Sequence, residues 1–141
     1  MSHKTLKAMF AAVCTLVCAA GVVKADQPVI SHVYTADPNA FVFNDRIYII
    51  CSHDIANQRG YDLFDYELVS TDDLQNWTDH GLVFSVGRGK GPSGQDKTDA
   101  PWAGRCYAPG TAIRDGKVYL YFPDGASSIG VAVADKPEGR S

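Results

Sequence analysis

Two stretches of the chain, residues 38–49 (PNAFVFNDRIYI) and residues 109–120 (PGTAIRDGKVYL), decide the fold because they repeat one pattern. The second follows the first in one ungapped register, at a separation of 71 residues. In each, an apolar run, a polar turn pair and a second apolar run follow a proline, and Asp115-Gly116 is a pair typical of type I′ hairpins. The repeat therefore predicts the same hairpin twice. The matched pairs are Pro38 and Pro109, Val42 and Ile113, Asn44 and Asp115, Arg46 and Lys117, Ile47 and Val118, Tyr48 and Tyr119, and Ile49 and Leu120.

Nearly every other pattern after residue 30 also indicates β-structure, and no segment keeps a 3.6-residue apolar period. Repeated antiparallel strands at this spacing are typical of β-propeller blades, each of about four strands. We therefore expect an all-β chain that forms about the first two blades, with four strands in the first blade and three in the second. The expected strands are 40–43, 47–51, 66–70, one around 82–84, 111–113, 117–122 and 129–133.

A propeller closes with typically about 4–8 blades, so fewer than two blades leave inner faces open. On such open faces, Phe41, Phe43 and Ile113 would be exposed to solvent. We therefore expect the sequence to be the N-terminal part of a longer protein. The alternative is a complete two-sheet β-domain of about 115 residues, which lies within the usual size of one domain.

Residues 1–25 have the pattern of a secretory signal peptide. Lys4 and Lys7 precede an apolar stretch, Ala8–Val23, and Val23-Lys24-Ala25 offers small residues at a cleavage site. The stretch is shorter than the roughly 20 residues that span a bilayer. We therefore expect a secreted or periplasmic protein that has no membrane contact after the signal peptide is cleaved. In such an oxidising compartment Cys51 and Cys106 could form a disulfide, and two buried thiols are the alternative.

The composition is that of an ordinary globular protein, with 45% hydrophobic and 21% charged residues. The formal net charge of −3 implies no basic face, so we expect no nucleic-acid partner. We expect a monomer.

Five residues are candidates for a binding or catalytic site. Asp37 comes just before the first strand, where a carboxylate could reach the mouth of the channel, although Asp-Pro also starts ordinary turns. His53 and Asp54 end the second strand. They could form hydrogen bonds with sugar hydroxyls, or they could belong to a surface turn. Trp102 and Tyr107 flank the second blade and could stack on a sugar ring, or pack in the core.

Four segments together resemble glycoside hydrolase family 43, a family of five-bladed propellers that cleave plant polysaccharides. The resemblance covers about Val29 to Gly139 and makes residues 26–141 the N-terminal part of such a domain. It implies hydrolysis of glycosidic bonds in arabinose-, xylose- or galactose-containing polysaccharides or oligosaccharides. The segments are Ala36–Phe41 with Arg46-Ile47-Tyr48, Ser70–Gly81, Tyr107–Pro109 with Arg114–Tyr121, and Gly130–Gly139.

The resemblance also implies that Asp37 is the general base of an inverting reaction. In such enzymes a second carboxyl, the general acid, stands about 6.5–9.5 Å away. The family takes this acid from a glutamate in a later blade, and a second aspartate tunes its pKa. Glu67 and Glu138, the two glutamates of this sequence, lie at neither expected place. We therefore expect the fragment alone to be inactive.

Metal and cofactor signals are weak in the sequence. The histidines at 3, 32, 53 and 80 have no metal-ligand spacing, so no metal site is expected among them. Asp62, Asp65 and Glu67 alternate as a calcium site would allow, but we expect a solvated face. The resemblance implies no cofactor, with room for a structural calcium ion in the full-length family fold.

Gly89–Gly94 fits the spacing of a dinucleotide-binding motif, but no helix follows it and Pro92 interrupts it. We therefore expect this segment to be a loop between blades.

The alternative to an enzyme is a non-catalytic, secreted carbohydrate-binding β-domain. A structural or adhesion β-domain without a sugar site is the third possible function.

Overall fold

The computed structural model describes residues 27–56, 61–87 and 98–139. Over these ranges it contains seven strands and no helix, so the all-β prediction is confirmed. No helix of this part of the chain is long and apolar enough to cross a membrane. The expected signal peptide and the Gly89–Gly94 loop lie outside the described residues. The strands are β1 (Tyr34–Phe43), β2 (Arg46–Asp54), β3 (Asp65–Thr71), β4 (Thr78–Ser85), β5 (Gly110–Arg114), β6 (Lys117–Asp124) and β7 (Ser128–Ala134).

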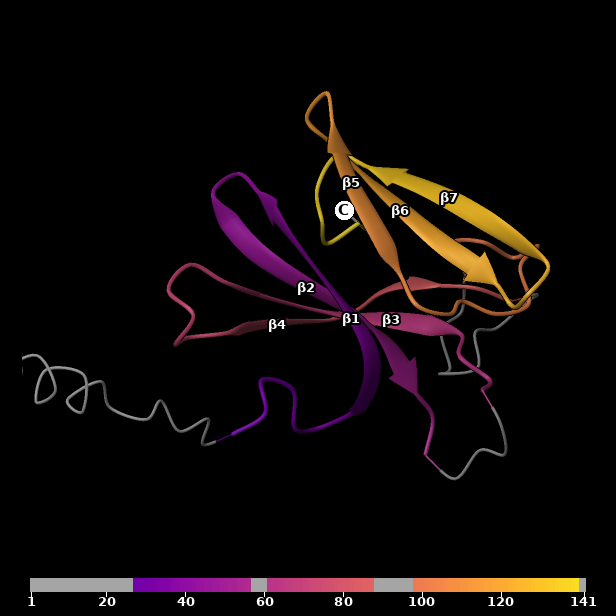
Figure 1. The fold of residues 1–141 in the computed structure, drawn as a ribbon, viewed down its shortest axis with the longest axis horizontal. Helices are drawn as coiled ribbons and strands as arrows, with labels where there is room; N and C mark the ends of the chain where they lie inside the picture. The colour runs from indigo at the N-terminus through magenta and orange to yellow at the C-terminus, as the bar shows by residue number, and fades with distance from the viewer. Residues whose placement is uncertain (1–26, 57–60, 88–97, 140–141) are drawn as a thin grey trace, which may run out of the picture.

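The strands form two antiparallel sheets in simple chain order, as propeller blades do. The first sheet has the order β1-β2-β3-β4 and the second has the order β5-β6-β7. Figure 1 shows the second sheet, in orange and yellow, lying beside the purple and pink first sheet. The expectation of four strands in one blade and three in the next is confirmed.

The repeated hairpin is present at both predicted places. Asn44 and Asp45 have φ angles of 49° and 61°, and Asp115 and Gly116 have 52° and 72°. A type I′ turn requires a positive φ at both central residues, which Asn, Asp and Gly tolerate best. The equivalent turns pair Phe43 with Arg46 and Arg114 with Lys117, so the repeat in the sequence is a repeat in space.

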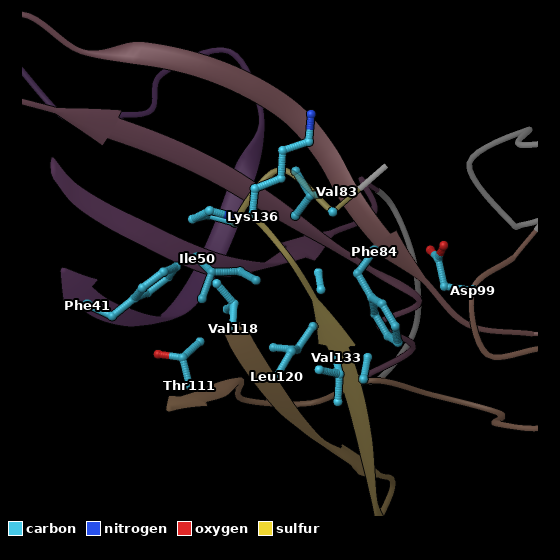
Figure 2. A pocket seen from close by; sticks show the side chains of 14 residues that line it. Phe41, Ile50, Val83, Phe84, Asp99, Thr111, Val118, Leu120, Val133 and Lys136 are labelled. Atoms are coloured by element: carbon cyan, nitrogen blue, oxygen red, sulfur yellow. The ribbon is translucent and has the colours of Figure 1, made fainter. Parts of the chain in front are cut away.

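The core lies between the two sheets. Alternate residues of β2 and β3 point to it, among them Ile50 and Leu68, and Val118 and Leu120 of β6 meet them from the other side. The rings of Phe84 and Phe122 lie with centroids 4.8 Å apart across the interface. Figure 2 shows Ile50, Phe84, Val118 and Leu120 around a pocket between the blades. The volume of this pocket is about 290 Å³.

Phe43 corrects one expectation. Its side chain is only 8% exposed because it points into the core, and Phe41 is partly buried against the same core. Val42 points to the opposite face and is 59% exposed, while Ile113 is exposed as expected. The two blades therefore already cover most of their shared inner face.

The second sheet keeps an open apolar face. Residues of β6 and β7 that alternate with the core positions lie on the side away from the first sheet. They are exposed although they are large and hydrophobic, as is typical of a surface that packs against another element. These residues are Tyr121, Ile129, Val131 and Val133.

Candidate functional site

The predicted site residues lie at one end of the two sheets. Strand pairing places Thr35 opposite His53, and Ser52 opposite both Ala36 and Tyr66, so the start of β1, the end of β2 and the start of β3 meet. The segment that enters the second blade runs along the same end, since the Cys106 amide donates to Leu63 O at 2.9 Å. The fold thus brings these candidates to one edge.

Asp37 lies in a bulge of β1. The pairing with β2 skips from Ala36 to Asn39, so Asp37 and Pro38 stand outside the ladder. Asp37 has a φ of 51°, which is uncommon for a residue other than glycine, and it is exposed. Bulges redirect a side chain, and such strained positions gather at functional sites. The local chain therefore turns this carboxylate out of the sheet and into solvent.

Tyr66 connects the first blade to the segment that enters the second blade. The Tyr66 side chain is fully buried, and its hydroxyl donates a hydrogen bond to the backbone oxygen of Tyr107. Burial raises the pKa of Tyr66, and the charges of Cys106 and Asp37 raise it further. Tyr107 itself is half-buried, and its amide donates to Pro123 O at 3.0 Å.

His53 is held by a partner that sequence reasoning missed. Its Nδ1 lies 2.7 Å from Oδ1 of Asp65, a fully buried aspartate, and the His53 side chain is 18% exposed. A carboxylate at Nδ1 favours the proton on that nitrogen, which leaves Nε2 as an acceptor in the neutral ring. The surface-turn alternative does not fit this burial. Asp54, the last residue of β2, is half-buried opposite Tyr34.

Trp102 packs against the core and still leaves much of its side chain exposed. Its ring packs on Phe122, with centroids 5.7 Å apart, yet 58% of the residue is exposed. A fixed aromatic ring with a free surface is suited to stacking on an apolar sugar face.

The segment around Trp102 is anchored by charged groups. Oδ1 of Asp124 accepts hydrogen bonds from the amides of Gly104 and Arg105, at 2.9 and 3.0 Å. The Arg105 guanidinium donates to Oδ1 of Asp62 at 2.8 and 2.6 Å. Arg105, Asp62 and Asp124 support the segment. The sequence patterns did not mark Arg105 or Asp124, and they suggested a different role for Asp62, because the partners are distant in the chain.

Asp62, just before β3, and Asp65 and Glu67 in β3 do not form the expected solvated face. Asp65 and Glu67 are buried because β3 is an inner strand of its sheet, with every residue buried. Asp62 accepts a hydrogen bond from Arg105, and Asp65 contacts Nδ1 of His53, so these two carboxylates serve different partners. These residues do not fit a calcium site.

Neither glutamate lies beside Asp37. Glu138 accepts a hydrogen bond from the Tyr48 hydroxyl at 3.2 Å. Glu67 points to the face opposite its buried neighbour Tyr66. Burial raises the pKa of Glu67 to about 7, with further contributions from Asp79 and Asp65. That the general acid is encoded outside this sequence stays a prediction.

Cys51 and Cys106 are both free and buried, so the thiol alternative holds in this structure. Burial raises the pKa of each thiol.

Comparison with known proteins identifies the family. The family model of glycosyl hydrolases family 43 matches residues 25–140. The chain is 44% identical over 127 residues to Xylosidase/arabinosidase 43A of Humicola insolens, covering 79% of this chain and 36% of the relative. It is 38% identical over 120 residues to a xylosidase/arabinosidase of Bacteroides ovatus, covering 75% and 34%. The chain therefore spans about a third of the length of these curated relatives.

Solved structures agree with the sequence comparison. A family 43 enzyme of Xanthomonas citri, solved with xylotriose, superposes with a TM-score of 0.65 at 39% identity, covering 80% of this chain and 32% of that one. A β-xylosidase/α-arabinofuranosidase from a compost metagenome gives 0.64 at 40% identity, with 80% and 35% covered. The two sheets are thus blades of a partial propeller, and the chain belongs to glycosyl hydrolase family 43.

Proposed function

We propose that this chain supplies the first two blades, and the general base, of a five-bladed enzyme that hydrolyses glycosidic bonds with inversion. The observation that carries the proposal is the bulge at Asp37, which turns an exposed carboxylate out of β1 at the edge where the other candidate residues gather. An exposed carboxylate outside the strand ladder is free to approach a water molecule.

In this mechanism Asp37 accepts a proton from a water molecule as the water attacks the anomeric carbon. The leaving oxygen departs from the opposite face and takes a proton from an acid about 6.5–9.5 Å from the base. His53, Asp54, Trp102 and Tyr107 would contact the sugar. His53 is suited to accept a hydrogen bond from a sugar hydroxyl through Nε2, since Asp65 occupies Nδ1.

The open face of the second sheet supports completion by further blades. Tyr121, Val131 and Val133 are 41%, 51% and 53% exposed, and a third blade would cover them. Because the acid would come from a later blade, the chain alone is expected to be inactive. Losing one member of an acid–base pair removes a rate factor of about 10²–10⁴.

The substrate class follows from the relatives. Two are named xylosidase/arabinosidase, and the Xanthomonas citri enzyme is in complex with xylotriose. These names favour xylose- and arabinose-containing chains over galactose-containing ones. We also propose export through the signal peptide at residues 1–25, and a monomer in solution.

The test uses the whole gene product, meaning the protein encoded by the complete gene that contains this chain. We expect it to release 4-nitrophenol from 4-nitrophenyl β-xyloside or α-arabinofuranoside, and to give a product of inverted anomeric configuration by NMR. Retention of configuration would contradict the mechanism.

The exposed ring of Trp102 also suits the alternative, a carbohydrate-binding domain without turnover. Calorimetry with xylotriose separates the two functions. Binding without any product after long incubation would favour the binding domain over the enzyme.

A further inference from the structure

Three potential metal ligands meet on the face of the first sheet that points away from the second blade. They are His32, from the segment before β1, Glu67 of β3, and Asp79 of β4. His32 Nε2 lies 3.0 Å from Asp79 Oδ2 and 3.9 Å from Glu67 Oε1. The three ligand atoms all lie within 4.8 Å of one another.

Glu67 has an oxygen that the described residues leave unsatisfied. Its side chain is only 3% exposed, and Oε1 is buried and has no hydrogen-bond partner there. A buried carboxylate oxygen without a partner carries a large desolvation cost. This oxygen is directed at His32, inside the cluster, so the fold has built a ligand position that nothing in the described chain fills.

Asp79 is oriented by a separate contact. Its Oδ1 accepts a hydrogen bond from the Gly81 amide at 2.8 Å, which leaves Oδ2 facing His32. Supporting hydrogen bonds of this kind fix ligand carboxylates in metal sites.

From these contacts we propose that His32 Nε2, Glu67 Oε1 and Asp79 Oδ2 bind one zinc ion, or a similar divalent transition-metal ion. Tetrahedral bonds of about 2.0–2.2 Å put ligand atoms roughly 3.3–3.6 Å apart. The distances of 3.0 and 3.9 Å from His32 Nε2 to the two carboxylate oxygens lie on either side of that range. One imidazole with two carboxylates suits zinc, whereas calcium takes about 6–8 oxygen ligands. His32 and Asp79 are half-exposed, so the ion has a path from solvent and a water can complete its coordination.

The ion would fasten the segment before β1 to the outer half of the first blade. Its ligands come from that segment, from β3 and from β4, which are distant in sequence. Its role is therefore structural. The site is separate from Asp37, and the inference does not depend on the hydrolase activity proposed above.

The competing explanation is a shared proton. Burial, with Asp79 nearby, raises the pKa of Glu67 to about 7, so a protonated Glu67 bonded to Asp79 could satisfy the pair without metal. Zinc would displace that proton to solvent. The two explanations differ in whether the cluster takes up metal.

The experiment measures zinc stoichiometry on the whole gene product after EDTA treatment and dialysis. Zinc alone is the probe, titrated against a chromophoric chelator at pH 7.5. We expect His32→Ala and Glu67→Gln to bind one zinc fewer than wild type, or to hold that zinc at least about tenfold more weakly. The matched control is His53→Ala, which removes another carboxylate-paired histidine and keeps the three ligands.

A second readout guards against misfolding of the Glu67 variant. His32 is half-exposed, so His32→Ala should fold. Zinc should then raise the melting temperature of wild type and His53→Ala but not of His32→Ala. Equal zinc binding by wild type and His32→Ala, or no tight zinc in wild type, would overturn the inference and favour the shared proton.

Discussion

Asn39 and Thr111 join the innermost strands of the two blades, because Thr111 Oγ1 donates a hydrogen bond to Asn39 Oδ1 at 2.6 Å. Asn39 is the residue at which β1 resumes its pairing after the bulge at Asp37. The position of the second blade relative to Asp37 is therefore tied by this side-chain contact as well as by the shared core.

Replacing Thr111 by valine should weaken this connection. The change keeps the shape of the side chain but removes the donor, so Asn39 loses a partner at a cost of about 1 kcal/mol. We expect the apparent melting temperature of the whole gene product to fall by about 2–4 °C. Thr111→Ser, which keeps the hydroxyl, should melt near wild type. Equal losses in the two variants would show that the methyl group, not the hydrogen bond, matters.

Gly130 is required by the ring of Phe122. A Cβ at residue 130 would lie 2.1 Å from Phe122 Cζ, and Phe122 is held between Phe84 and Trp102. Gly130→Ala should therefore destabilise the protein by about 1–3 kcal/mol, as overpacking does. Thermal melting measures the loss.

Gly110→Ala is the control for that substitution. Its Cβ would meet Tyr121 Cβ at 3.9 Å, an ordinary contact, so this variant should be neutral or slightly stabilising. If the two alanine variants melt alike, the Phe122 ring moves aside and this description of the core is wrong.

The two thiols should be unreactive in the folded protein. Cys51 and Cys106 are buried, and burial raises the pKa of each, which keeps the nucleophilic thiolate scarce at pH 8. Iodoacetamide followed by peptide mass spectrometry should find both alkylated only after denaturation. Peptides linked through Cys51 and Cys106 in unreduced protein would instead reveal the disulfide.

The local part of the fold was predictable from the sequence. All seven strands have alternating or apolar runs bounded by turn residues, and both repeated turns contain the residues that tolerate a positive φ. Asp37, His53, Asp54 and Tyr107 could be selected for the same reason, since each lies near the start or end of a strand.

Contacts across strands were not predictable. Asp65 fixes His53, and Tyr66 reaches Tyr107, only because strand pairing and blade packing bring them together. The burial of Glu67 likewise depends on the position of β3 inside its sheet. A sequence pattern indicates which side chains share a face of a strand, but not which strand lies beside it. The acids of the inner strand β3 were therefore expected to be solvated.

Trp102 should contribute to sugar binding in the whole gene product. Trp102→Ala removes the exposed ring, and we expect KM for xylo-oligosaccharides to rise roughly fivefold, since ring contacts contribute about 0.5–1.5 kcal/mol. Trp102→Phe should recover part of the affinity. An unchanged KM in the alanine variant would assign Trp102 to packing on Phe122 alone.

The central claim is that Asp37 is the general base, and steady-state hydrolysis of a 4-nitrophenyl pentoside by the whole gene product tests it most directly. The comparison is between Asp37→Asn and Asp45→Asn, two isosteric changes at exposed aspartates of positive φ, the second in the hairpin turn. We predict that Asp37→Asn lowers kcat by about 10²–10⁴ while Asp45→Asn stays within about twofold of wild type. Equal activity in the two variants would contradict the account.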